Sequence, residues 1–198
     1  MIFARDSALT LVQETNRKDG YDFKKSVNYV DLSSYHKQIM SGDKSSHYLA
    51  IVGIYNDRII PMIDCDSIED YKIAFNHFSK LEINCALIQS SPNHYWLFPD
   101  ISFNSVEAAL FTMHLIPGCD QKYIKFTKNR QFFAIRGELK AIDEVPRLIY
   151  NECSEMNIVC FISKLIEHFK DDRILQIANK KFRKKSFPSY PTSSLIGY

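Results

Sequence analysis

Between Tyr48 and Leu115, segments with the hydrophobic pattern of strands alternate with segments that have the hydrophobic period of helices. This alternation constrains the fold more than any other feature of the sequence. Paired β-branched and apolar runs separated by turn residues predict hairpins, whereas apolar residues three and four apart predict helices. One helix start is marked by Ser67-Ile68-Glu69-Asp70, which has the form of a capping box. In chain order, the sequence predicts strands at 48–54 and 58–63, a helix at 67–81, strands at 84–89 and 94–98, and a helix at 105–115.

The regions before Tyr48 and after Leu115 carry shorter patterns. In the first of them, Asp31 is a candidate helix cap. The further predicted elements are a helix at 31–40, strands at 123–126 and 131–136, and amphipathic helices at 156–169 and 171–185. This order predicts an α+β fold, in which an antiparallel or mixed sheet similar to that of an RNA-recognition motif is covered by helices and followed by a helical C-terminal part. We expect a single domain over 1–198, with an N-terminal accessory segment at 1–45, a catalytic core at 46–140, a helical part at 141–185 and a tail at 186–198.

The charge of the chain is nearly balanced overall but segregated along the sequence. The formal net charge is +2, which argues against a protein that coats nucleic acid by bulk charge. Residues 121–140 and 180–185 nevertheless hold 11 basic and 1 acidic residue, so the other 172 residues hold 14 basic and 22 acidic ones. This segregation predicts basic surfaces that flank an acidic cluster.

Cysteine usage indicates a reducing compartment. The chain has 5 cysteines, an odd number, and none lies in a C-x-x-C pair. We therefore expect free thiols and no structural zinc. Arg5 and Asp6 interrupt the first apolar stretch, and no run approaches the roughly 18 apolar residues of a membrane span. The expected location is cytoplasmic, with no membrane partner.

Ile63-Asp64-Cys65-Asp66 is the most informative motif of the chain. Because side chains alternate along a strand, Asp64 and Asp66 share one face while Cys65 points to the other. Paired carboxylates suit Mg²⁺ or Mn²⁺. The alternative is structural, since two aspartates at a strand end can simply cap the next helix.

Two further motifs add groups that bind phosphate. The turn Ser90-Ser91-Pro92-Asn93 is followed by His94 in an aromatic strand, and together they offer hydrogen-bond donors. Asp120 precedes the basic stretch 121–140, whose cations could neutralise phosphate charge. Each of these features also has a simpler interpretation. The histidine can have a structural role in its strand, and the basic stretch can be a hairpin with solvated side chains.

In this order and on these elements, the three motifs resemble the archaeo-eukaryotic primase (primase-polymerase) superfamily over about Tyr48 to Lys140. The family's catalytic module has a sheet like that of an RNA-recognition motif. It carries an Asp-x-Asp strand, then a Ser-x-His-like strand, then a single acid followed by a basic strand. The resemblance implies a template-dependent nucleotidyltransferase of DNA replication. It would join nucleoside triphosphates on single-stranded DNA by attack of a 3′-hydroxyl on the α-phosphate, with release of pyrophosphate.

The resemblance also implies roles for single residues. Asp64, Asp66 and Asp120 would be the catalytic acids that hold two divalent ions, Mg²⁺ or Mn²⁺. His94 would contact the phosphates of the nucleotide, although an ungapped match puts Trp96, on the same strand face, at the family's histidine position. The other residues implied to bind nucleotide are Ser91, Asn93, Lys128, Arg130 and Arg136.

The C-terminal run of Lys180, Lys181, Phe182, Arg183, Lys184 and Lys185 combines positive charge with one aromatic ring. Such a run can hold the phosphates of single-stranded DNA and stack on a base, and its alternative is a charged helix end. Larger family members carry a zinc element or a helicase domain. We therefore expect a minimal catalytic module that works with a helicase or an accessory replication subunit.

Two other functions compete with this interpretation. The first is a non-catalytic nucleic-acid-binding module on the same type of sheet, in which the acids are structural. The second is a phosphatase similar to haloacid dehalogenases, with Asp64 and Asp66 in the nucleophile motif. That family carries its motif on the first strand, however, whereas here an earlier strand is predicted before it.

Overall fold

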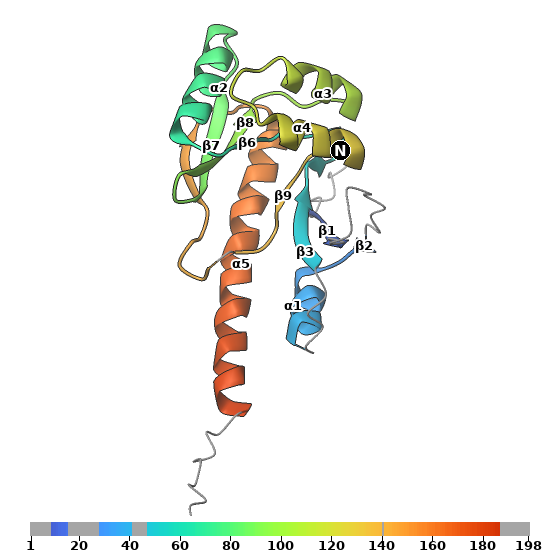
Figure 1. Ribbon diagram of the computed structural model, residues 1–198, viewed down its shortest axis with the longest axis vertical. Helices are drawn as coiled ribbons and strands as arrows, with labels where there is room; N and C mark the ends of the chain where they lie inside the picture. Colours follow the sequence, from blue (N-terminus) through green and yellow to red (C-terminus); the bar gives the residue numbers. More distant parts are fainter. Residues whose placement is uncertain (1–8, 16–27, 41–46, 140, 187–198) are drawn as a thin grey trace, which may run out of the picture.

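The computed structural model describes residues 9–15, 28–40, 47–139 and 141–186 of the chain (Figure 1). Within these residues, five helices accompany two four-stranded antiparallel sheets and one two-stranded hairpin. The predicted α+β class is therefore confirmed. In these described residues the longer strands form two four-stranded sheets, however, where the sequence predicted one.

The sheet that carries Asp64 has the strand order β10-β7-β8-β6. Both β6 and β7 run antiparallel to β8, so they are parallel to each other with β8 between them, in a split βαβ arrangement. The connecting helix α2 starts as predicted, because the Ser67 side chain accepts a hydrogen bond from the Asp70 N–H at 3.1 Å. The bounds are β6 Ile63–Cys65, α2 Ile68–Lys80, β7 Cys85–Ser91, β8 His94–Pro99 and β10 Arg147–Asn151.

Helices cover both faces of this sheet. On one face, Tyr95 of β8 contacts Tyr71 of α2, with 4.7 Å between ring centroids. On the other, Trp96 stacks on Phe169 of α5 (Met156–Ser186) at 5.7 Å. Because alternate residues of β6 share a face, Asp64 lies on the α5 side together with its cross-strand partner Trp96. Figure 1 shows α5 running past both sheets.

The second sheet has the strand order β2-β1-β3-β9. Between the predicted strands at 48–54 and 58–63, Asn56 and Asp57 form a turn with φ of 49° and 58°, but it joins only the two-residue strands β4 and β5. Most of the predicted strand at 48–54 is instead β3, which ends at Val52 and pairs with β1 and β9. At the next residue, Gly53, the chain packs closely on the segment that follows the turn, since a Cβ atom would lie 2.4 Å from the Ile60 carbonyl oxygen. The bounds are β1 Thr10–Thr15, β2 Asn28–Tyr29, β3 His47–Val52, β4 Ile54–Tyr55, β5 Arg58–Ile59 and β9 Ala134–Arg136.

Two predictions from periodicity are wrong. The predicted strand at 123–126 is part of helix α4 (Gln121–Arg130), whose buried residues Tyr123, Ile124 and Thr127 follow helical spacing. The two predicted C-terminal helices are one helix, α5, because no glycine or proline interrupts residues 156–186.

The remaining predictions are mostly confirmed. Helix α1 (Leu32–Met40) starts where expected, with the Asp31 carboxylate accepting a hydrogen bond from the Ser34 N–H at 2.9 Å. Helix α3 (Val106–His114) is capped by Ser105. Strand β10 falls in the part of the chain predicted as helical, and β1 and β2 were not predicted. Residues 187–198 of the predicted tail lie outside the described residues.

Candidate functional site

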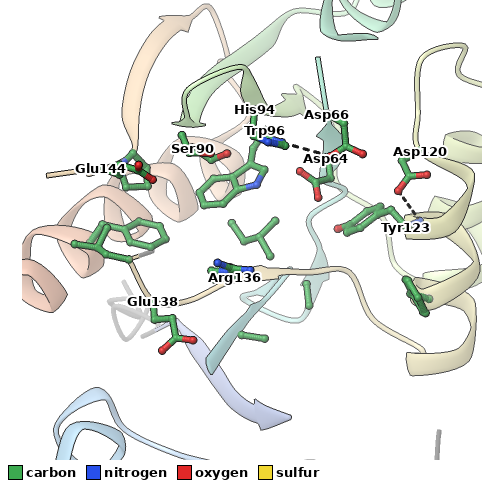
Figure 2. A pocket seen from close by; sticks show the side chains of 18 of the residues that line it. Asp64, Asp66, Ser90, His94, Trp96, Asp120, Tyr123, Arg136, Glu138 and Glu144 are labelled. Carbon is green, nitrogen blue, oxygen red and sulfur yellow. Dashed lines mark hydrogen bonds and ion pairs between the residues drawn. The ribbon is translucent and has the colours of Figure 1, made fainter. Parts of the chain in front are cut away.

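A cavity of about 670 Å³ lies where β9 of the second sheet faces β6 and β8 of the first (Figure 2). Its volume falls in the range of small-molecule sites, roughly 300–1,000 Å³. It brings together residues from all three sequence motifs. The predicted site residues that line it are Asp64, Asp66, Ser91, His94, Asp120, Arg130 and Arg136.

The first two motifs meet because β6 and β8 are hydrogen-bonded neighbours. Asp64 lies directly across from Trp96 in the ladder. Asp66 directly follows β6, and its carboxylate lies 3.4 Å from His94 Nδ1. The exposed fraction is 68% for the Asp66 side chain and 40% for that of His94. Cys65 is fully buried on the opposite face, as the alternation predicted. Trp96 also lines the cavity, so both candidates for the family's histidine position face it.

Asp120 approaches the cavity from the start of α4. One carboxylate oxygen accepts a hydrogen bond from the Lys122 N–H at 2.9 Å and the other from the Tyr123 N–H at 3.2 Å. Asp120 is therefore the N-cap of α4, a structural role that follows from replacing the predicted strand by a helix. Its carboxylate still borders the cavity, as Figure 2 shows.

Two arginines supply positive charge at the cavity. Arg136 projects from β9, and Arg130 lies near the end of α4 with its guanidinium 5.7 Å from the centroid of the Phe126 ring. Two residues that the resemblance implies are not among those lining the cavity. Lys128 is exposed on α4, and Asn93 is exposed in the β7–β8 turn with φ of 64°.

Sequence reasoning missed three polar residues of the cavity wall, Tyr123, Glu138 and Glu144. The position of Tyr123 follows from Asp120 as a helix cap, since a residue three further on lies one turn away on the same helix side. Glu138 and Glu144 lie in an irregular segment without a local pattern. Burial raises the pKa of Glu138, against the hydrogen bond that the Tyr35 hydroxyl donates to it at 2.5 Å.

A buried polar network fixes the segment that follows β9 and forms this wall. One Asp172 oxygen lies 2.6 Å from His36 Nε2, and the other accepts a hydrogen bond from the Leu139 N–H at 2.8 Å. His168 Nε2 donates to the Gly137 carbonyl at 2.6 Å. The network joins α1 and α5 to the chain that carries Arg136 into the cavity.

The carboxylates offer a partial fit to a divalent ion. Across the described ranges 9–15, 28–40, 47–139 and 141–186, no three His, Cys, Asp or Glu side chains are grouped so that they could hold a metal ion. Mg²⁺ typically takes only one or two carboxylates and completes its shell with water and substrate phosphates. Asp64 of β6 and Asp66, the residue that follows this strand, both line the cavity and fit that donor set.

The basic C-terminal run lies at the end of α5. Residues 180–185 are helical, and Lys180 is exposed. The side chains of Lys181, Phe182, Arg183, Lys184 and Lys185 lie outside the described ones. All five cysteines of the chain are free thiols, three of them buried.

No protein-family model, curated protein or solved structure significantly matches the chain. Among the helices of the described part of the chain, none combines the length and apolar character that crossing a bilayer requires. The geometry of the cavity is therefore the basis for assigning a function.

Proposed function

We propose that the chain is a template-dependent nucleotidyltransferase of the DNA primase/polymerase type, which joins nucleoside triphosphates on single-stranded DNA during replication. One observation supports it above the others. A single cavity of nucleotide size is lined by three aspartates, a histidine and two arginines. These residues lie up to 72 positions apart in the sequence, the distance between Asp64 and Arg136. The split βαβ sheet that carries Asp64 and His94 agrees with a fold like the RNA-recognition motif.

In this proposal the carboxylates bind the metal ions, and the other polar residues of the cavity bind the nucleotide. Two divalent cations, Mg²⁺ or Mn²⁺, supply charge stabilisation to the attacking and leaving oxygens when bound. Asp64 and Asp66, with Asp120 beside them, would hold these ions. His94 and Ser91 would bind phosphate oxygens, with Asn93 in the adjoining turn. Arg130 and Arg136 would neutralise the charge of the triphosphate.

The chemistry balances without a protein nucleophile. A 3′-hydroxyl oxygen loses its proton to water and forms the new bond to the α-phosphorus, the bond from that phosphorus to the bridging oxygen breaks, and pyrophosphate leaves. The template strand would lie along basic surfaces, the exposed lysines of α4 such as Lys128 and the run at 180–185. A helicase or accessory replication subunit is the proposed protein partner.

A second candidate is the non-catalytic nucleic-acid-binding module. It is favoured by Asp120, whose two oxygens both cap α4, and by the lack of a three-ligand group among the described side chains. The phosphatase has less support, because five strands precede β6 and β6 is an edge strand antiparallel to β8.

The decisive experiment measures incorporation of labelled nucleotides on a single-stranded template with Mg²⁺ or Mn²⁺. We expect the wild-type chain to make or extend primers. Asp64→Asn and Asp66→Asn should each reduce the rate by at least about 100-fold, since each removes a charge that binds the ions without changing side-chain size. Asp57→Asn, at an exposed turn position outside the cavity, should leave the rate unchanged.

Incorporation that persists in both cavity variants would contradict the proposal. Oligonucleotide binding by wild type without incorporation under either metal would select the binding module instead.

A further inference from the structure

Glu144 lies apart from the three aspartates of the cavity. Asp64, Asp66 and Asp120 lie toward one end, and Glu144 lies toward the other, with Trp96 between them in the view of Figure 2. In the proposed function, divalent cations neutralise the charge of the aspartates. Glu144 is only half-buried, so its carboxylate is open to a molecule bound in the cavity that it lines.

Glu144 also differs from Glu138, the other glutamate of the cavity wall. The Glu138 carboxylate accepts a hydrogen bond from the Tyr35 hydroxyl at 2.5 Å. In the described part of the chain, Glu144 makes its hydrogen bond through the backbone N–H, which donates to the Ala141 carbonyl at 3.0 Å, and no described side chain pairs with its carboxylate. Of the two glutamates, Glu144 therefore has its full acceptor capacity left for a ligand.

The cavity wall also has apolar members on this side. Pro146, two residues after Glu144, is buried and lines the cavity. Trp96 lines it as well, and its ring is held in place by Phe169, with 5.7 Å between the ring centroids. Apolar walls with a few polar groups are typical of sites for small organic molecules. They suit the base and sugar of a nucleotide better than its phosphates.

Charge decides which part of a nucleotide can lie beside Glu144. A carboxylate repels a phosphate, and this repulsion is stronger in a partly enclosed site than in bulk water. Neutral hydroxyl and amino groups, in contrast, donate hydrogen bonds to a carboxylate, and such bonds are stronger than those between two neutral groups. The phosphates therefore lie toward the aspartates and their cations, and the nucleoside lies toward Glu144.

We propose that the Glu144 carboxylate accepts a hydrogen bond from the nucleoside part of the bound nucleotide, donated by a sugar hydroxyl or by a base amino group. This inference rests on the proposed function, which places a triphosphate beside Asp64 and Asp66. Glu144 is thereby assigned as a residue that binds the nucleoside and adds nothing to the binding of the phosphates.

The test is isothermal titration calorimetry of the full chain with Mn²⁺ and two probes, a non-hydrolysable adenosine triphosphate analogue and inorganic tripolyphosphate. We expect Glu144→Ala to weaken binding of the nucleotide by about 10-fold, the usual effect of losing a hydrogen bond to a charged group. Tripolyphosphate should bind to this variant as tightly as to wild type or more tightly, because a negative charge has been removed. Asp143→Ala removes the same charge at the adjacent exposed position outside the cavity, and it should leave nucleotide binding unchanged.

Two related probes identify the donor. The 2′,3′-dideoxy analogue lacks the sugar hydroxyls, and the inosine analogue carries an oxygen in place of the base amino group. Wild type should bind one of them about 10-fold more weakly than the adenosine analogue. Glu144→Ala should lose this discrimination, because the acceptor of the hydrogen bond is gone.

The outcomes separate this inference from the proposed function. If wild type binds neither the nucleotide nor tripolyphosphate, the proposed function fails and the assignment of Glu144 fails with it. If wild type binds and Glu144→Ala binds the nucleotide equally well, only the assignment fails. An equal loss of nucleotide and tripolyphosphate in the variant would also overturn the assignment, as would wild-type binding of the dideoxy and inosine analogues that is as tight as that of the adenosine analogue.

Discussion

Asp120 combines a structural position with a place at the candidate site. Its carboxylate caps α4 and borders the cavity that also holds Asp64 and Asp66. Asparagine caps helices about as well as aspartate, whereas alanine costs about 1 kcal/mol. Comparing the two substitutions therefore separates the contribution of charge from that of the cap.

We expect Asp120→Asn to keep the free energy of unfolding within about 1 kcal/mol of wild type, and Asp120→Ala to lower it by about 1–2 kcal/mol. Both should lose nucleotide incorporation if the charge helps to hold the ions. Urea denaturation and the incorporation assay supply the two readouts. Full incorporation by the asparagine variant would assign Asp120 to the helix cap alone.

The direction of a side chain could be predicted from sequence only where it follows from the residues next to it in the chain. Asp64 and Cys65 could be placed on opposite faces because period-two alternation is a property of the strand itself. Tyr123 could not, because its direction depends on whether residues 121–130 form a helix or a strand. Glu138 reaches the cavity through the packing of an irregular segment, which no local pattern encodes.

Among the elements, α4 and α5 show why two predictions failed. In α4, lysines at positions 122, 125 and 128 are exposed, so their three-residue spacing is helical and the apolar residues between them only imitate a strand. In α5, Asp171-Asp172 looked like a helix start. Asp172 instead lies fully buried in mid-helix, where it accepts the hydrogen bond of the Leu139 N–H. A long-range partner thus explains a polar pair that sequence alone assigns to a cap.

The buried position of His168 in α5 predicts that stability depends on pH. Burial lowers its pKa from 6.5, against the hydrogen bond to the Gly137 carbonyl and the nearby Asp172 and Asp171, which raise it. The unfolded chain therefore binds a proton more readily than the folded one. The contribution of His168 to stability is complete above pH 6.5, and it is lost as the pH falls toward the lowered pKa of the folded state.

We expect the free energy of unfolding from urea titrations to decrease between about pH 7.5 and pH 5.5. His168→Gln keeps a donor for the Gly137 carbonyl but does not titrate, so its decrease should be shallower. His114→Gln, at an exposed position on α3, should follow wild type. Equal slopes for all three proteins would show that His168 does not control this dependence.

The molecule as a whole is organised around the space between two sheets. One wall comes from β6 and β8 and the other from β9, which reaches its position by pairing with β3, about 80 residues earlier in the chain. Strand pairing over such distances is set by packing and not by local sequence. The sequence could therefore predict the class of the fold and most elements from 48 to 115, but not the division into two sheets or the cavity between them.

The separation of charge is another property of the whole molecule. The cavity gathers five carboxylates, while the exposed lysines of α4 and Lys180 at the end of α5 carry positive charge elsewhere. A nearly neutral chain can thus combine a cavity rich in acids, which also holds Arg130 and Arg136, with separate basic surfaces.

The most direct measurement is the anomalous scattering of Mn²⁺ in crystals of the full chain grown with a non-hydrolysable nucleoside triphosphate. The account predicts a manganese peak in contact with the carboxylates of both Asp64 and Asp66, with the triphosphate in the same cavity. In crystals of the Asp64→Asn variant the peak should be lost or strongly reduced. A wild-type crystal with the nucleotide bound away from these aspartates, or with no manganese beside them, would contradict it.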